Sequence, residues 1–498
     1  MNKPWSFFKL ALVLLFSFLC QAIAAQQNVV AELNNYFNAL YRARQFNGNV
    51  LVAEKGKIIY ERSFGYADFS AKKPNTKNTS FPVASITKTF TSTAILQLQE
   101  RGKLDINDRF IKYFAGFPYP SVTIRQLLSH TSYLPSSAFY AFLDSLQKVK
   151  DTFFINNDVI PALIAMKKPL LGLPKGDRSD FSYSNLNYYL LALLIEKLSG
   201  LPYGNYIKKN IFMPAGMEHS SLSEFYFGLD KNLCREQKYR FLFSEIPERI
   251  DTMANNLSIF RTYNFKGHGD IVSTVDDLLK YDQALYNGIL LKENSIDLAY
   301  DVMVPGESGN SGYGLGWSIA PDSSNGKIVL HHGGGIGIEA MLVRNIARHQ
   351  TVILFDNTKN FAFYTAMSAL DILNGKKPPL VKPSVAKLYG KTLVNEGIPA
   401  ARKLLERLKK DTLNYLLTED GMNVLAYQLM WNNINEKAME VFQTNLELFP
   451  DSWNSYDSYG EILVKMGRKE EAIKMYQRSI ELNPKNEGGK KVLADLLK

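Results

Sequence analysis

The sequence predicts an α+β unit followed by an all-α region. Residues 49–60 have the pattern of a β-hairpin with Lys55-Gly56 at its turn, and residues 341–343 and 351–355 form a second strand pair. Helical patterns lie between and after these strands. Strands at both ends of a block with helices between them favour one sheet that contains the first and the last strand.

Three helical segments support this assignment. They cover residues 85–102, 187–200 and 361–373, and the first two end at Gly102 and Gly200. Glycine directly after the last periodic residue is a common helix end. We therefore expect the unit to extend over residues 26–375.

The composition is that of a globular protein. The chain has 498 residues, of which 46% are hydrophobic and 21% charged. These values exclude a wholly disordered, collagen-like or disulfide-scaffold protein. The net charge of +10 is spread without a long run of like charge. We interpret it as a diffuse surface bias and expect no nucleic-acid partner.

Residues 1–25 are predicted to be a signal peptide. Lys3 and Lys9 flank a short positive start, residues 10–19 are almost purely apolar, and residues 22–24 offer a small-residue cleavage site. The apolar stretch is too short to span a bilayer, and no later stretch is long and apolar enough to do so. An exported protein without a transmembrane span in its mature chain is expected.

The two cysteines leave alternatives open for the N-terminus. Cys20 permits a lipid anchor, although Leu19 is larger than the residue that usually precedes a lipidated cysteine, and an uncleaved anchor is a further alternative. If the leader is removed, only Cys234 remains. No intramolecular disulfide is then possible, so the fold must depend on its core.

The C-terminal region repeats itself with a period of 34 residues. Three positions recur at this spacing: Ala438, Phe442 and Pro450 return as Ala472, Tyr476 and Pro484. Small, aromatic and proline positions at this period resemble tetratricopeptide repeats. We expect a linker and a degenerate helix pair at 376–418, repeats at 419–452 and 453–486, and a capping helix at 487–498. Such a region is a candidate contact site for a protein partner, and the alternative is that it only packs on the first unit.

Candidate catalytic residues begin with Ser85 and Lys88. On a helix this spacing places a hydroxyl and an amine on one face. A serine needs a neighbouring base to act as a nucleophile, and a partly desolvated lysine can lose its proton and serve as that base. The motif is weak alone, because Ser70-x-x-Lys73 and Ser145-x-x-Lys148 share it. A helix-capping serine beside a surface lysine is the alternative.

Tyr183 and Asn185 precede a long helix, where a loop presents side chains to a cleft. A phenol beside cations can be shifted toward phenolate and act as a proton shuttle. Asn185 could bind a substrate amide. Tyr203-Gly204-Asn205 has the same spacing, so this motif is also weak alone.

The third motif is glycine-rich and begins with two histidines. It spans His331 to Gly337 and reads His-His-Gly-Gly-Gly-Ile-Gly. Glycines let a substrate backbone lie close to the chain. His332 would be its donor or cation, or His331 if the register slips by one residue. The other histidines show no metal-binding spacing, so no metal is expected.

Together, S-x-x-K, Y-x-N and H-x-G in this order resemble the serine β-lactamase-like hydrolases. The tyrosine of the second motif favours the branch of class C β-lactamases, D,D-peptidases and β-lactamase-fold esterases. Four further segments are similar to family sequences: residues 127–132, 214–217, 270–274 and 313–317. The resemblance covers roughly residues 30–375. It implies an antiparallel sheet flanked by helices plus a helical subdomain.

The resemblance also implies roles for individual residues. Ser85 would be the acylated nucleophile, Lys88 its general base or proton partner, and Tyr183 would help to activate Ser85 or the deacylating water. Asn185 would hold the substrate or orient Lys88. These roles need no cofactor.

The glycine-rich motif would supply the rest of the site. His332, Gly333 and Gly334 would replace the Lys-Thr-Gly strand of β-lactamases, and Gly335 would join Ser85 in the oxyanion hole. Because a neutral imidazole attracts a substrate carboxylate less than an ammonium does, the histidine favours esterase or peptidase action over efficient β-lactam hydrolysis. A second departure is Tyr133, which stands where the family usually has glycine.

The resulting hypothesis is an exported serine hydrolase of the bacterial periplasm. It would act through an acyl-enzyme on a small-molecule or peptide substrate: an ester, an amide or a D-amino-acid peptide. The alternative is a catalytically inactive, penicillin-binding-like scaffold that acts through its repeats.

Overall fold

The structure is a computed structural model that describes residues 27–147, 154–171, 181–222, 232–250, 264–306, 312–320, 326–358 and 362–498. Its contacts divide the chain into two compact units. The first contains the chain up to Lys238 and Arg249–Pro379, and the second contains Tyr239–Glu248 and Leu380–Lys498. The predicted signal peptide and Cys20 lie outside the described residues.

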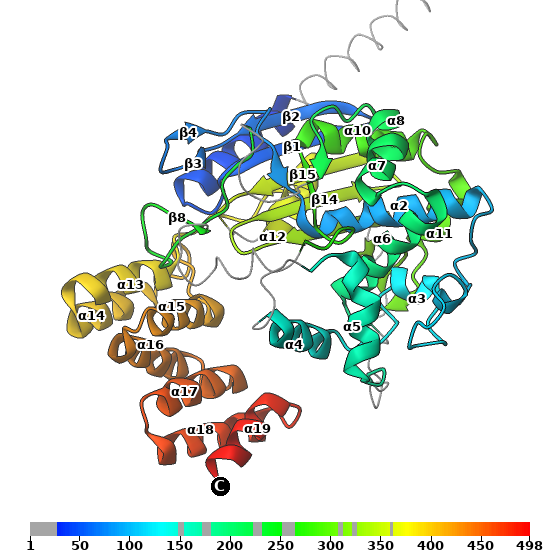
Figure 1. The fold of residues 1–498 in the computed structure, drawn as a ribbon. Helices are drawn as coiled ribbons and strands as arrows, with labels where there is room; N and C mark the ends of the chain where they lie inside the picture. The colour runs from blue at the N-terminus through cyan, green and yellow to red at the C-terminus, as the bar shows by residue number, and fades with distance from the viewer. Residues whose placement is uncertain are drawn as a thin grey trace, which may run out of the picture. The chain divides into compact units, whose positions relative to one another are not determined.

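An antiparallel sheet forms the centre of the first unit (Figure 1). It has eight strands in the order β10-β11-β12-β13-β14-β15-β1-β2. Its strands are β1 (Gly48–Glu54), β2 (Lys57–Ser63), β10 (Val304–Pro305), β11 (Gly312–Tyr313), β12 (Ser318–Ile319), β13 (Ile328–Gly334), β14 (Glu339–Asn345) and β15 (Gln350–Asp356). β1 pairs with β15, with Val52 opposite Val352. The expectation that the first and last strands share one sheet is confirmed.

Helices cover this sheet, and its middle strands are buried on both faces. Every residue of β14 and β15 is buried. Strands buried on both faces need a layer on each side. Two helices, α10 (Val275–Tyr286) and α12 (Ala362–Leu373), pack against β15, and α12 also contacts β14. Residues 27–42 form a further helix, in which Phe37 stacks on Tyr60 of β2.

The helical part of the first unit is built around α2 (Thr87–Glu100) and α6 (Asn185–Ser199), which contact each other. Most of both helices is buried, and they confirm the two helices predicted here. Around them lie α3 (Ile124–Leu128), α4 (Ser136–Gln147), α5 (Val159–Met166), α7 (Tyr203–Ile207), α8 (Met213–Ala215), α11 (Glu293–Tyr300), the π-helix η4 (Lys208–Phe212), and the 3-10 turns η1 (Ala84–Ile86), η2 (Phe110–Lys112) and η3 (Asn156–Asp158).

Two small sheets complete this unit, β5-β9-β6 (Phe81–Pro82, Ile271–Ser273, Ser221–Leu222) and β3-β4 (Tyr66–Asp68, Lys73–Pro74). A further two-stranded sheet, β7-β8 (Gln237–Lys238, Glu248–Arg249), includes Glu248, which is counted with the second unit. The sheet β5-β9-β6 matters for function, because the chain leaves β5 directly into η1, the turn that carries Ser85.

The second unit consists of antiparallel helix pairs. Its helices are α13 (Val385–Glu396), α14 (Ile398–Leu408), α15 (Glu419–Trp431), α16 (Asn435–Leu448), α17 (Trp453–Lys465), α18 (Lys469–Leu482) and α19 (Glu487–Leu496). The pairs α15/α16 and α17/α18 coincide with the two predicted repeats. Ala438 and Ala472 are fully buried, and Gly460 lies against the ring of Tyr476, which explains the small residues at these positions.

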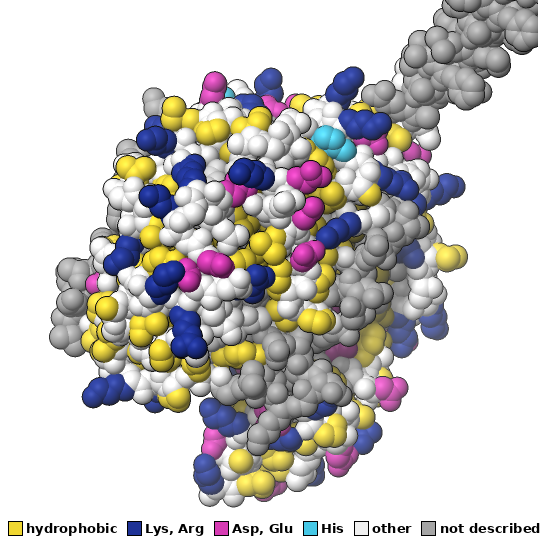
Figure 2. Space-filling view, turned by 90° about the vertical axis from the view of Figure 1, so that its right-hand side faces the viewer, with side chains coloured by type: hydrophobic (Ala, Val, Ile, Leu, Met, Phe, Trp, Pro, Cys, Tyr) yellow, Lys and Arg dark blue, Asp and Glu magenta, His cyan; other side chains and the backbone are white. Residues whose placement is uncertain are grey.

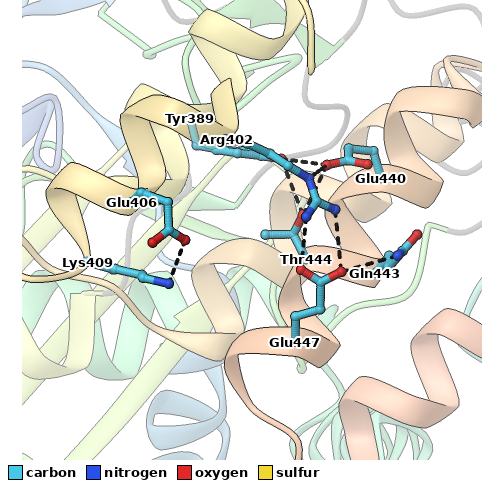
Figure 3. A network of polar contacts seen from close by, with 8 residues as sticks. All are labelled: Tyr389, Arg402, Glu406, Lys409, Glu440, Gln443, Thr444 and Glu447. Atoms are coloured by element: carbon cyan, nitrogen blue, oxygen red, sulfur yellow. Dashed lines mark hydrogen bonds and ion pairs between the residues drawn. The ribbon is translucent and has the colours of Figure 1, made fainter. Parts of the chain in front are cut away.

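A polar network joins the first helix pair to the first repeat (Figure 3). From α14, Arg402 lies 2.6 Å from a carboxylate oxygen of Glu440 and 3.0 Å from one of Glu447, both on α16. Tyr389 of α13 donates to Glu440 at 3.3 Å. The pair α13/α14 thus lies within residues 376–418, where a linker and a degenerate helix pair are expected, and α13 contacts α15.

The segment Tyr239–Glu248 also belongs to the second unit, which the sequence did not predict. Phe241, Leu242 and Phe243 pack on the apolar core of the helix pairs, and the amide of Leu242 donates to Gln428 at 2.5 Å. Nothing in the local pattern of this segment distinguishes it from an ordinary loop.

In the described part of the chain, no helix has the length and apolarity needed to cross a membrane. On the face shown in Figure 2, Lys and Arg side chains are interspersed with Asp and Glu. This distribution agrees with a diffuse positive charge.

Candidate active site

Ser85 lies in the tight turn η1 at the start of α2. β5 pairs with β9, and the amide of Val83 donates to Ile271 at 2.9 Å, which holds the chain in place up to the turn. Ala84 then has a φ of 45°, a left-handed conformation that a residue with a side chain rarely adopts. The strained residue directly before Ser85 turns the chain sharply from the strand into the helix.

The side chains of Ser85, Lys88 and Tyr183 meet at one point. Lys88 Nζ lies 3.0 Å from Ser85 Oγ, and the hydroxyl of Tyr183 donates to the same Oγ at 2.8 Å. Lys88 Nζ also donates to the carbonyl oxygen of His268 at 2.8 Å. The two motifs are 98 residues apart in sequence, and the contact of α2 with α6 brings them together.

Burial sets the protonation of the two groups around Ser85. Lys88 is fully buried, and desolvation holds its pKa well below the ordinary lysine value, although the charge of Asp270 opposes this shift. Burial raises the pKa of Tyr183 to about 12, against a smaller opposite effect of its hydrogen bond with Ser85. The sequence predicts that cations shift Tyr183 toward phenolate; the structure instead favours a neutral phenol at Tyr183, beside a lysine whose pKa is lowered.

The other occurrences of these motifs do not form such a cluster. Ser70 donates to Asp68 at 2.6 Å in the β3–β4 turn. Ser145 donates to the carbonyl of Phe142 on an exposed turn of α4, and its partner Lys148 lies outside the described residues. The hydroxyl of Tyr203 is buried against Thr91.

β13 passes directly beside the turn that carries Ser85. A Cβ atom built on Gly333 would lie 2.1 Å from the carbonyl oxygen of Val83, which is closer than real Cβ contacts. Only glycine fits there, so this position fixes the approach of the glycine-rich strand to the nucleophile.

The two histidines of β13 have different surroundings, because side chains alternate along a strand. His331 is buried, and its Nδ1 lies 2.8 Å from the carbonyl oxygen of His332. A carbonyl only accepts, so Nδ1 carries the proton and Nε2 accepts from the hydroxyl of Tyr313 at 3.0 Å. Burial and the charge of Lys88 lower the pKa of His331 to about 3, so the ring is neutral.

His332 is 46% exposed and pairs with Glu339 on β14. The sequence favours His332 as the donor of this motif, with His331 as the alternative register. The structure brings His331 to the buried side near Lys88 and leaves His332 paired with Glu339, so the choice between the two registers stays a prediction.

The backbone amides of the glycines also differ in their availability. Gly335 donates to the carbonyl of Ile338 at 3.0 Å, where β13 turns into β14. The amide of Gly335, which the sequence places in the oxyanion hole, is therefore already engaged in a backbone hydrogen bond. Because paired and unpaired positions alternate in an antiparallel ladder, the amide of Gly334 points away from β14. β12 pairs with β13 only at Val329 and Leu330, so it does not cover this edge.

Asn185 is the first residue of α6. Its Oδ1 is buried and has no hydrogen-bond partner among the described residues. The hydrogen bonds of Lys88 go to Ser85 and His268, so the structure does not show Asn185 orienting Lys88. The side chain of Asn185 also interacts with the hydroxyl of Tyr140, and its role in holding the substrate stays a prediction.

Two contacts of the site were missed by sequence reasoning. The carbonyl of His268 has no sequence signal, because a backbone acceptor can come from any residue type. His130, which holds the segment around Tyr183, lay in the Leu-Leu-Ser-His-Thr-Ser segment that was noted only as a family similarity. Tyr133, also near that segment, has a φ of 53°, a conformation that glycine adopts readily, in line with the glycine that the family resemblance implies there.

In the described residues, no group of three or more His, Cys, Asp or Glu side chains could hold a metal ion. Comparison with known proteins agrees with this geometry: a family model described as Beta-lactamase matches residues 33–373, around all three motifs.

The chain belongs to the beta-lactamase family. A second family model, described as Tetratricopeptide repeat, matches residues 454–486, which confirms the repeat that contains α17 and α18. The chain is thus a serine hydrolase of the beta-lactamase family with a C-terminal repeat region.

Relatives of this beta-lactamase family member include penicillin-binding proteins. Penicillin-binding protein 4* of Bacillus subtilis (strain 168) is 32% identical over 438 residues, which are 86% of this chain and 91% of the relative. The octameric penicillin-binding protein homologue from Pyrococcus abyssi is 26% identical, with a TM-score of 0.57, over 73% of this chain and 81% of that structure.

A D-amino acid amidase from Ochrobactrum anthropi SV3 shares the fold. Its structure has a TM-score of 0.55 at 22% identity and covers 70% of this chain and 98% of its own length. A shared fold does not fix the substrate, which depends on the residues of the site.

Proposed function

We propose that this chain hydrolyses esters or amides through an acyl-enzyme formed on Ser85. The observation that carries the proposal is the convergence on Ser85 Oγ of Lys88 Nζ at 3.0 Å and the Tyr183 hydroxyl at 2.8 Å. The alternative of an inactive scaffold gains no support from a site in which all three side chains are assembled.

Acylation begins when neutral Lys88 takes the proton of Ser85, directly or through the hydroxyl of Tyr183. Oγ attacks the carbonyl carbon, and the carbonyl oxygen gains the negative charge. The amides of Ser85 and Gly334 stabilise this oxyanion in the proposed mechanism. Tyr183, which keeps its proton near neutral pH, protonates the leaving alcohol or amine as its bond to carbon breaks. Lys88 then returns its proton to Tyr183.

Deacylation repeats these transfers with water. A water molecule gives its proton to the Lys88–Tyr183 pair and attacks the acyl carbon. The bond to Oγ breaks, Oγ recovers the proton, and the carboxylic acid leaves. Burial of Lys88 supports both steps, because its lowered pKa makes the neutral amine more available than that of an exposed lysine.

The surroundings of β13 support a substrate that carries no carboxylate beside the reacting bond. His331 is neutral and both of its ring nitrogens are engaged, and His332 is paired with Glu339. Neither histidine therefore offers a free cation. We expect neutral esters and amides to be better substrates than D-amino-acid peptides that end in a carboxylate, and β-lactams to be poor ones.

Active-site labelling tests this function. The intact mass of the wild type should increase by one adduct with a fluorophosphonate, and Ser85→Ala should gain none. Turnover of p-nitrophenyl butyrate should then exceed turnover of a D-alanyl-D-alanine peptide. A wild type that gains no adduct, or a Ser85→Ala variant that labels equally well, would refute the assignment.

We also propose export to the bacterial periplasm and a protein partner for the repeats. The pattern of residues 1–25 supports export, and the match to a tetratricopeptide repeat supports a protein contact. Cell fractionation with N-terminal mass analysis tests the first: the chain recovered from the periplasm should begin near Gln26. A chain recovered from the cytoplasm with its leader intact would contradict it.

A further inference from the structure

His130 holds the chain on both sides of Tyr183. It is fully buried and follows α3, with a φ of 59°. The amide of Ser182 donates to the carbonyl of His130 at 2.8 Å, and the amide of Ser184 donates to its ring Nδ1 at 3.0 Å. The two amides that flank Tyr183 are thus bound by one residue.

The ring of His130 also supports the ring of Tyr183. Their centroids are 4.3 Å apart with a tilt of 32°. Since Nδ1 accepts a backbone hydrogen bond, the neutral ring carries its proton on Nε2. Burial, with the nearby charge of Lys88, lowers the pKa of His130 well below the ordinary value. His130 therefore contributes geometry and no charge beside Lys88.

Tyr183 needs such support because of its place in the fold. Residues 181–184 form no helix or strand, and Tyr183 is 45% exposed. Packing therefore covers only part of the residue, yet its hydroxyl must stay within hydrogen-bond distance of Ser85 Oγ to move a proton. Hydrogen bonds to the backbone on either side of Tyr183 can fix the position of its side chain.

We propose that His130 is the positioning residue of Tyr183: it places the phenol on Ser85 Oγ by binding the amides of Ser182 and Ser184. The inference rests on the proposed role of Tyr183 in acylation. It concerns a buried residue that itself touches neither the nucleophile nor the general base by hydrogen bond.

Two substitutions separate this role from simple packing. His130→Leu fills the space but removes the acceptor for Ser184. His130→Asn keeps an acceptor atom close to the position of Nδ1, and asparagine tolerates a positive φ well. With p-nitrophenyl butyrate we expect kcat of His130→Leu to fall about 100-fold with KM within about threefold of the wild type, because a shift of about 1 Å costs that much. His130→Asn should stay within about fivefold.

A double-mutant cycle tests whether His130 acts through Tyr183. In a Tyr183→Phe background, His130→Leu should lower kcat by less than about threefold, since the positioned hydroxyl is already absent. If His130 only maintained the structure, its full effect would persist in that background.

His349→Leu is the matched control, because His349 also has a positive φ, of 53°, and lies outside the site. It should leave kcat within about twofold. If His130→Leu does not fold, His130→Gln, whose amide lies nearer to the position of Nε2, takes its place.

Equal losses in His130→Leu and His130→Asn, or full additivity with Tyr183→Phe, would overturn the inference. A wild type that neither labels at Ser85 nor turns over the ester would overturn the proposed function as well. An active wild type with an equally active His130→Leu variant would overturn only the role of His130.

Discussion

Replacing Gly333 by alanine inserts one methyl group between β13 and the turn that carries Ser85. The new Cβ would lie 2.1 Å from the carbonyl oxygen of Val83 and 3.3 Å from Cβ of Ala84. Both the strand and the turn are held by backbone hydrogen bonds, so no flexible side chain can move aside. Since Cβ atoms essentially never approach other atoms within 3.0 Å, the two segments must separate by about 1 Å.

A separation of this size predicts a large loss of activity and a smaller loss of stability. Misplacement by about 1 Å costs about 100-fold in rate, because the oxyanion donors and the nucleophile no longer face the same carbonyl. Overpacking costs about 1–3 kcal/mol of unfolding free energy. The rate of fluorophosphonate labelling, kcat/KM for p-nitrophenyl butyrate and a thermal melt measure the three effects.

Gly204→Ala makes the same chemical change where there is space. Its Cβ would lie 3.4 Å from a methyl group of Leu222, an ordinary contact, so kcat/KM should remain within about twofold. If Gly333→Ala labels and turns over as fast as the wild type, β13 does not set the geometry of the nucleophile, and the placement of the oxyanion hole at Gly334 is also wrong.

Three further predictions concern charge. Lys88→Met should lower the rate of fluorophosphonate labelling by at least about 10²-fold. The pKa of Lys88 is lowered in the folded state, so the unfolded wild type binds more protons than the folded one up to about pH 10. The stability of the wild type should therefore rise with pH in that window, and melts of the variant at the same pH values should lack this rise. His331→Phe should lower kcat/KM more than tenfold and His332→Asn less than threefold; the reverse order in the same ester assay would return the role to His332. Arg402→Met leaves Glu440, 11% exposed, without its cation, and should cost about 1–2 kcal/mol in urea unfolding followed by helical circular dichroism; an unchanged midpoint would show that the network of Figure 3 adds no stability.

Much of the site could be predicted because its chemistry depends on local spacing. Ser85 and Lys88 are one helical turn apart, so their common face follows from the period of the helix. The pairing of Tyr183 with them followed from the family resemblance, since a distance of 98 residues in sequence contains no geometric information by itself.

The register of the glycine-rich strand could not be predicted with the same certainty. His331 and His332 are adjacent residues of the same type, so the sequence does not distinguish them. Side chains alternate between the two faces of a strand, and the two histidines can be told apart only when the buried face is known. Whether Gly334 or Gly335 donates to the oxyanion likewise depends on which of the two amides is already hydrogen-bonded in the β13–β14 turn.

The sequence by itself determined the fold class, the helix pairs of the C-terminal region and the residue types of the catalytic cluster. These features follow from local properties of the sequence: the period of its hydrophobic residues, the positions of glycine and proline, and short spacings between polar residues. Only the tertiary structure decided which histidine faces Lys88, which amide remains for an oxyanion, and that His130 holds both sides of Tyr183. It also showed that Tyr239–Glu248 belongs with the helix pairs. These features depend on contacts between distant segments, whose burial and hydrogen-bond partners exist only after the chain has folded.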